Sequence, residues 1–285
     1  MIAEDYLREG KLDEAFAELK KVVQANPADA KYRVFLFQMM TVLGKWESAL
    51  TQLELSGELD AGNLAMVQAY REAIRCEVLR HKVMSGDRQP MIFGEPEPWI
   101  AMMLEAFKLQ ATGHLPQACQ LRAEALEQAP AVSGTLIDSD EKPVRFEWIC
   151  DSDPRLGPIL ETLINGQYYW VPMHRIAKIT IDPPSDLRDF VWSAAHFTWS
   201  NGGETFGMIP SRYPGSETSE DAAIRLSRKT DWECVGDEAD PSQYIGHGQR
   251  MLATDVDEFA LFQIRSLELD VEMEQADPEP DDETN

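Results

Sequence analysis

The chain has 285 residues, a hydrophobic fraction of 44% and a formal net charge of −24. That length is enough for two domains with packed cores, and the composition is typical of a globular protein. The acidic chain lacks the clustered Lys and Arg that hold phosphate groups, which excludes nucleic acid and anionic membrane surfaces as partners.

The sequence predicts neither a secretory signal nor a membrane span. Its amino terminus carries no apolar run, and no window of the sequence approaches the length of a membrane span. The four cysteines are scattered without a C-x-x-C pair, which is typical of buried thiols in a reducing compartment. We therefore expect a cytoplasmic protein without a metal site, a disulfide bridge or a cofactor.

Three stretches of the first half share one spacing. Gly10, Gly44 and Gly113 are each followed by an apolar residue at offset 2 and by an alanine at offset 5. Two of the stretches also have a proline at offset 17, Pro27 and Pro130. This is tetratricopeptide spacing, in which glycine turns the chain between two helices and proline ends the second helix. The first half is therefore predicted to be a stack of helical hairpins.

Apolar residues recur with a period of 3.6 in this half, which predicts where its helices lie. A concentration of helix breakers between residues 84 and 98 interrupts them. The helix predicted at residues 31–43 has almost no polar face, so it should be enclosed on several sides. The predicted helices cover residues 12–25, 31–43, 46–55, 64–83, 99–112 and 115–128.

Beyond residue 133 the period changes toward 2, and short aromatic and β-branched runs predict strands. Asn165-Gly166 and the Asn-Gly-Gly run at 201–203 are typical of hairpin turns. Helices are predicted at 156–164 and at 219–228, the second with Ser219 as its cap. The predicted strands cover residues 145–150, 167–172, 176–181, 195–200, 205–210 and 259–267.

The predicted fold class is therefore α followed by α+β. TPR-like helical hairpins occupy residues 1–133, and a mainly antiparallel α+β domain occupies residues 134–270. An acidic disordered tail follows at 271–285, because nine acidic residues and no Lys or Arg occur from residue 268 onward. The tail is either a solvating end or a docking segment for a basic partner.

No catalytic or metal-binding motif is present. The five histidines show no ligand pair, and the chain has no nucleophile elbow, P-loop or dinucleotide fingerprint. Asp151-Ser152-Asp153 resembles the start of a calcium loop, but Pro154 follows and the required glycine and distal glutamate are missing. We interpret this segment as a turn that starts the helix predicted at 156–164.

Several residues of the second half are candidates for partner binding. Three consecutive aromatics at 168–170 alternate faces of one strand, so one of them either points outward as a binding anchor or packs under a loop. A cluster of arginines, aspartates and rigid turn residues at 186–189 and 212–215 is either a ligand loop or a salt-bridged corner. The candidate residues are Tyr168, Trp170, Asp186, Arg188, Trp192, Arg212 and Tyr213.

A family resemblance runs from the first residues to about residue 270. The chain resembles the ImpE family, also called SciE-type virulence proteins or TagJ; the acidic tail and the insert at 236–243 lie outside the pattern. The motifs that carry the resemblance are V-F-L-F-Q at 34–38, L-G-K-W at 43–46, F-G-E-P-E-P-W at 93–99, Y-Y-W-V-P at 168–172, D-L-R-D at 186–189 and R-Y-P-G-S-E at 212–217.

The resemblance implies an accessory protein of the bacterial type VI secretion system that has no catalytic residues. It also implies association with the small sheath subunit, and so with the sheath that the ClpV ATPase recycles. The residues themselves fit an adaptor that binds an amphipathic helix carrying Lys or Arg. Two alternatives remain open: a structural plug, and an enzyme or small-ligand protein with a site near His196, Glu204, Arg212 and Tyr213.

Overall fold

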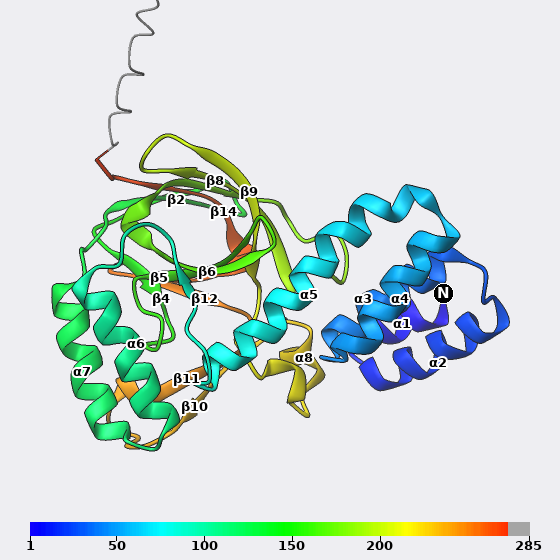
Figure 1. Cartoon of the computed structure of the whole chain (residues 1–285), viewed down its shortest axis with the longest axis horizontal. Helices are drawn as coiled ribbons and strands as arrows, with labels where there is room; N and C mark the ends of the chain where they lie inside the picture. The colour runs from blue at the N-terminus through cyan, green and yellow to red at the C-terminus, as the bar shows by residue number, and fades with distance from the viewer. Residues whose placement is uncertain (273–285) are drawn as a thin grey trace, which may run out of the picture.

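The computed structural model describes residues 1–272, in which a helical half precedes a half made mainly of antiparallel sheet (Figure 1). The predicted fold class is confirmed. Apart from its first two residues, the predicted acidic tail lies outside the described residues. Within residues 1–272, no helix combines the length and the apolar character that crossing a membrane would require.

Three helical hairpins form at the three predicted glycines. Gly10, Gly44 and Gly113 separate the paired helices and have φ values of 76°, 65° and 84°, which a residue with a side chain adopts only at a cost. A long single helix, α5 (Leu64–Met84), stands between the second and third hairpins. The paired helices are α1 (Ile2–Arg8) with α2 (Leu12–Ala25), α3 (Ala30–Val42) with α4 (Trp46–Leu59), and α6 (Pro98–Ala111) with α7 (Leu115–Gln128).

Two of these glycines offer a matched stability test. A Cβ atom on Gly44 would lie 2.4 Å from Cγ of Glu217, whereas nothing lies within 4 Å at Gly113. We expect Gly113→Ala to cost about 1–2 kcal/mol through its positive φ alone. Gly44→Ala should cost about 1 kcal/mol more because its Cβ atom would meet Glu217. The extra cost stays this small because the Glu217 side chain can partly move away. Urea unfolding measures both, and equal costs would contradict the contact between Gly44 and Glu217.

The second half is built on a nine-stranded sheet with the order β1-β6-β5-β9-β8-β7-β14-β2-β3, in which only the β1–β6 pair is parallel. Smaller sheets pair β10 (Thr230–Cys234) with β11 (Tyr244–Gly248), and β12 (Met251–Thr254) with β13 (Glu258–Ala260) and β4 (Ile149–Asp151). The large sheet consists of β1 (Met91–Ile92), β2 (Gly134–Asp138), β3 (Pro143–Phe146), β5 (Ile159–Ile164), β6 (Gln167–Pro172), β7 (Ile176–Ile181), β8 (Trp192–Trp199), β9 (Glu204–Pro210) and β14 (Ile264–Leu269).

The two faces of the large sheet have different neighbours. One face carries an apolar core that includes Phe197 of β8, Ile179 of β7 and Leu252 of the three-stranded sheet. On the other face, Tyr168 and Trp170 belong to the same buried cluster as the helices. That cluster spans both halves, so the helices and the sheet share a core. The division into domains at residue 133 stays a prediction.

Several predicted elements need correction. The helix at 156–164 is wrong, because residues Ile159–Ile164 form β5. The predicted last strand at 259–267 is divided between β13 and β14, and the strand at 145–150 is divided between β3 and β4. The predicted helix at 219–228 is the short α8 (Ala222–Arg225), and its cap is Asp221, which accepts a hydrogen bond from Ala223 N at 2.8 Å, instead of Ser219.

Candidate functional site

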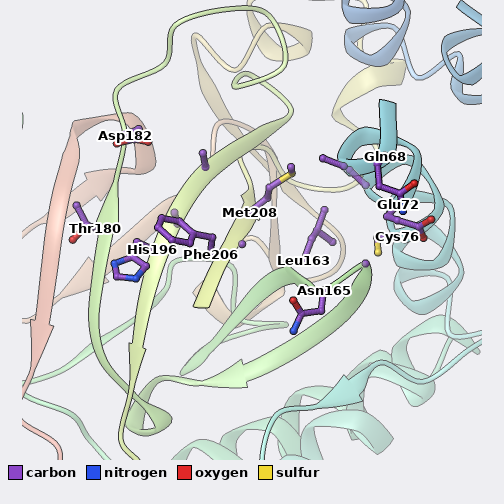
Figure 2. A pocket seen from close by; sticks show the side chains of 16 residues that line it. Gln68, Glu72, Cys76, Leu163, Asn165, Thr180, Asp182, His196, Phe206 and Met208 are labelled. Atoms are coloured by element: carbon purple, nitrogen blue, oxygen red, sulfur yellow. The ribbon is translucent and has the colours of Figure 1, made fainter. Parts of the chain in front are cut away.

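An open groove lies between helix α5 and the strands β7, β8 and β9 (Figure 2). Its volume is about 620 Å³. The helix contributes one wall, the turn between β5 and β6 closes one side, and the sheet forms the floor. The side chains that line it include Glu72 and Cys76 from α5, Leu163 from β5, Asp182 after β7, His196 from β8, and Phe206 and Met208 from β9.

An exposed aromatic side chain marks the floor of the groove. Phe206 is 80% exposed, the largest exposure among the large hydrophobic side chains of the described residues. It lies directly opposite His196 across the β8–β9 pair, and the two rings stack with centroids 4.5 Å apart. The cross-strand partner therefore fixes the orientation of an apolar ring that faces solvent.

The charged groups at the groove are mainly acidic. Glu72 accepts a hydrogen bond from Arg75 at 2.8 Å, and Asp182 is exposed at the end of β7. His196 lies 3.6 Å from Glu204, measured from Nε2 to Oε2. No Lys or Arg is among the residues that line the groove. A ligand with positive groups would thus meet a favourable potential here.

The groove offers little reactive chemistry. Burial raises the pKa of the Cys76 thiol to about 12, so this cysteine stays protonated and is a poor nucleophile at neutral pH. In the part of the chain that the structure describes, no three side chains of His, Cys, Asp or Glu lie close enough to hold a metal ion. An apolar floor with acidic walls is suited to binding a peptide or helix.

Next to the groove along α5, a buried ion-pair network joins this helix to the sheet. The Arg80 guanidinium donates to both carboxylate oxygens of Glu161 at 2.8 Å, and Arg250 and Tyr168 donate to the same carboxylate. Burial alone would raise the pKa of Glu161, but the charges of Arg80 and Arg250 outweigh it and hold the pKa well below its usual range. The network fixes α5, and with it one wall of the groove.

Asp151 forms the second acidic centre of this network. Arg250 pairs with its carboxylate, and the hydroxyl of Tyr213 donates to it at 2.9 Å. Burial raises the pKa of Asp151 to about 6, although the neighbouring Arg250 opposes the shift. The predicted turn at 151–153 is therefore part of the packed core that holds the smaller sheet against the large one.

The raised pKa of Asp151 predicts a pH dependence of stability. Between the ordinary carboxyl pKa and about 6, the folded state binds more protons at this site than the unfolded state, so stability falls as pH rises. Relative to Asp151→Asn, wild-type protein should lose roughly 2–3 kcal/mol of unfolding free energy between about pH 4 and pH 7. Urea unfolding of both proteins at several pH values measures this, and a difference that is flat or grows with pH would contradict it.

Five of the seven predicted partner-binding residues are buried in this region. Tyr168, Trp170 and Tyr213 lie within or next to the network, and the indole of Trp192 donates to Glu77 at 3.1 Å. Arg212 is buried at the ends of two helices, α3 and α8. A partner that docks on the surface does not reach these five side chains in this conformation.

The other two predicted residues are partly exposed. Arg188 pairs with Asp186, and its guanidinium lies over the ring of Tyr70, 4.8 Å from the centroid. This ion pair fits one of the two alternatives, a salt-bridged corner, for residues 186–189, whereas Arg212 donates to carbonyl oxygens of α3 and α8 instead. A partner-binding role for Asp186 and Arg188 stays a proposal.

The sequence reasoning did not single out Phe206, the most exposed aromatic of the groove. A signal was available: within the strand at 204–210, Phe206 alternates in phase with the charged Glu204. An aromatic that shares a face with a charged residue is a candidate for exposure. The sequence predicts the strand, but its residues were not assigned to a buried and an exposed face.

Comparisons with known proteins agree with the family resemblance. Residues 143–268 match the family described as ImpE protein. A Pseudomonas aeruginosa protein named type VI secretion system accessory component TagJ is 44% identical over 270 residues, which cover 95% of this chain and 92% of the relative. The X-ray crystal structure of protein VPA1032 from Vibrio parahaemolyticus shares the fold, with a TM-score of 0.83, 24% identity, and coverage of 94% of this chain and 97% of that one. The chain therefore belongs to the ImpE family, which includes the type VI secretion system accessory component TagJ.

Proposed function

We propose that this chain is a non-enzymatic adaptor of the type VI secretion system. In this proposal it binds a helical segment of the small sheath subunit in the cytoplasm and links that subunit to sheath assembly or to recycling by the ClpV ATPase. Family membership supports the accessory role. The observation that carries the binding role is the open, apolar groove beside α5, with Phe206 exposed on its floor.

An enzymatic role has less support at this groove. Its cysteine is protonated at neutral pH, and its histidine is stacked on Phe206 beside Glu204. An apolar, solvent-facing aromatic has a direct use in a protein interface, where aromatic anchors carry much of the binding energy.

Isothermal titration calorimetry of the full-length chain against purified small sheath subunit tests the proposal. Micromolar or tighter binding that a synthetic peptide of one subunit helix reproduces is the expected result. Because the chain is acidic, association should also slow as salt is raised. An absence of binding at high protein concentration would overturn the adaptor proposal.

A further inference from the structure

The layer of helices over the large sheet is incomplete. On the face that packs against α5, the strands β5 and β6 contribute buried side chains such as Leu163 and Tyr168. The next strand, β9, continues this face with Met208 and Phe206, of which Met208 is half-buried and Phe206 exposed. The apolar surface thus extends one step beyond the edge of α5.

The same face becomes polar two strands further on. Thr180 and Lys178 of β7 lie opposite His196 and Thr198 of β8, and both are exposed. The uncovered strip between α5 and β7 is therefore about two strands wide, with Phe206 and Met208 of β9 as its apolar part and Ala194, His196 and Thr198 of β8 beside them. Neighbouring strands are about 4.8 Å apart, so the strip measures roughly 10 Å across, which is close to the diameter of an α-helix.

The charges beside the strip determine which charged residues are favourable on the two sides of a helix that binds there. Glu72 borders it on the α5 side and Asp182 on the β7 side, while Glu204 lies beyond the ring of Phe206. Arg75 of α5 and Lys178 of β7 are neighbouring cations, and each already pairs with an acidic residue, Arg75 with Glu72 and Lys178 with Glu268. An occupant with Lys or Arg beside its apolar stripe gains from this field, and one with Asp or Glu loses.

We propose that this groove takes one amphipathic helix that lies beside α5 across β8 and β9. Its apolar stripe contacts Phe206 and Met208, and its basic residues face Glu72 and Asp182. The helix completes the layer that α5 begins. This inference rests on the proposed function for the identity of the partner, and it adds the docking site and the charge pattern that the site selects.

Two synthetic peptides test the charge pattern on the full-length protein. Both have the same leucine stripe at i, i+3, i+4 and i+7, and their flanking positions are lysine in one and glutamate in the other. We expect the lysine peptide to bind at least about tenfold more tightly. Phe206→Ala should weaken that binding about tenfold or more, since it removes a central anchor. Equal affinities of the two peptides, or unchanged binding by Phe206→Ala, would overturn the inference.

Two further variants sharpen the result. The double substitution Glu72→Gln with Asp182→Asn should reduce the discrimination between the peptides to a few-fold, and full retention would count against the proposed flanks. Val256→Ala is the matched control, because Val256 is also an exposed apolar residue but lies outside the groove. Thermal melts confirm that each variant is folded, which the exposure of Phe206 makes the expected result.

The same variants separate this inference from the proposed function. If wild-type protein binds the small sheath subunit and Phe206→Ala binds it equally well, the groove is wrong and the adaptor role stands. If wild-type protein binds the lysine peptide in a Phe206-dependent manner but not the subunit, the groove stands and the adaptor role fails.

Discussion

Replacing Glu161 by glutamine is expected to destabilise the protein by about 3–5 kcal/mol. Glu161 is fully buried and its carboxylate accepts from Arg80, Arg250 and Tyr168. Glutamine keeps the shape of the side chain but leaves two buried guanidinium groups without their shared counter-charge. Chemical denaturation monitored by tryptophan fluorescence measures the loss of unfolding free energy.

The control for this substitution is Glu105→Gln on the surface of α6. Glu105 also pairs with a cation, Lys108, at 3.7 Å, but both side chains are largely exposed. Surface pairs contribute little, so this variant should stay within about 0.5 kcal/mol of wild type. Similar small effects for both variants would show that the network does not hold α5 on the sheet.

Arg212→Lys is expected to lower the free energy of unfolding by about 3–4 kcal/mol, although both side chains are basic. The guanidinium donates to the carbonyl oxygens of Thr41 and Val42 at the end of α3, at 3.0 and 2.8 Å, and to that of Arg225 in α8 at 2.6 Å. Lysine is shorter and cannot span these acceptors, so buried carbonyl groups would lose their partners. Burial already lowers the pKa of Arg212, and a lysine there would lose its proton more readily.

Urea unfolding gives the size of this loss, and amide hydrogen exchange gives its location. Protection should fall first at the end of α3 and in the turn that contains Gly44, which lie next to the carbonyl acceptors that lose their donor. Arg8→Lys is a suitable control because Arg8 is 73% exposed in its pair with Asp5. A uniform loss of protection throughout the chain would contradict a local role for Arg212 at α3.

The helical half could be predicted well because its signals are local. The period of 3.6 together with the turn glycines gives α2 and α7 with their observed bounds, and the other predicted helices within a few residues. The exception in the second half, β5, is buried at every position and so has no polar alternation. Glu161 and Thr162 are buried together with the apolar residues of this run, so the sequence reads equally as a strand or as a buried helix, and only the neighbouring strands decide between them.

The buried network could not be predicted from the sequence. Glu161 stands 81 residues from Arg80 and 89 residues from Arg250, and no local pattern indicates that these charges meet. Without these pairings, Tyr168 and Arg212 look like surface anchors, whereas their polar atoms are satisfied inside the protein. The groove depends on the same long-range packing, since its wall and its floor come from α5 and from strands more than 80 residues later.

The sequence positions of the network also set an order of events during synthesis. Arg80 and Glu161 leave the ribosome well before Arg250, which follows Glu161 by 89 residues. At a synthesis rate of about 5–20 residues per second, roughly 4 to 18 seconds pass between the synthesis of Glu161 and that of Arg250. The contacts between the two helices of each early hairpin are local and can form during that interval. During this interval Glu161 has Arg80 but not Arg250 as a partner, and Asp151 has no guanidinium partner, so the charges of the core are only partly paired when a chaperone meets the nascent chain.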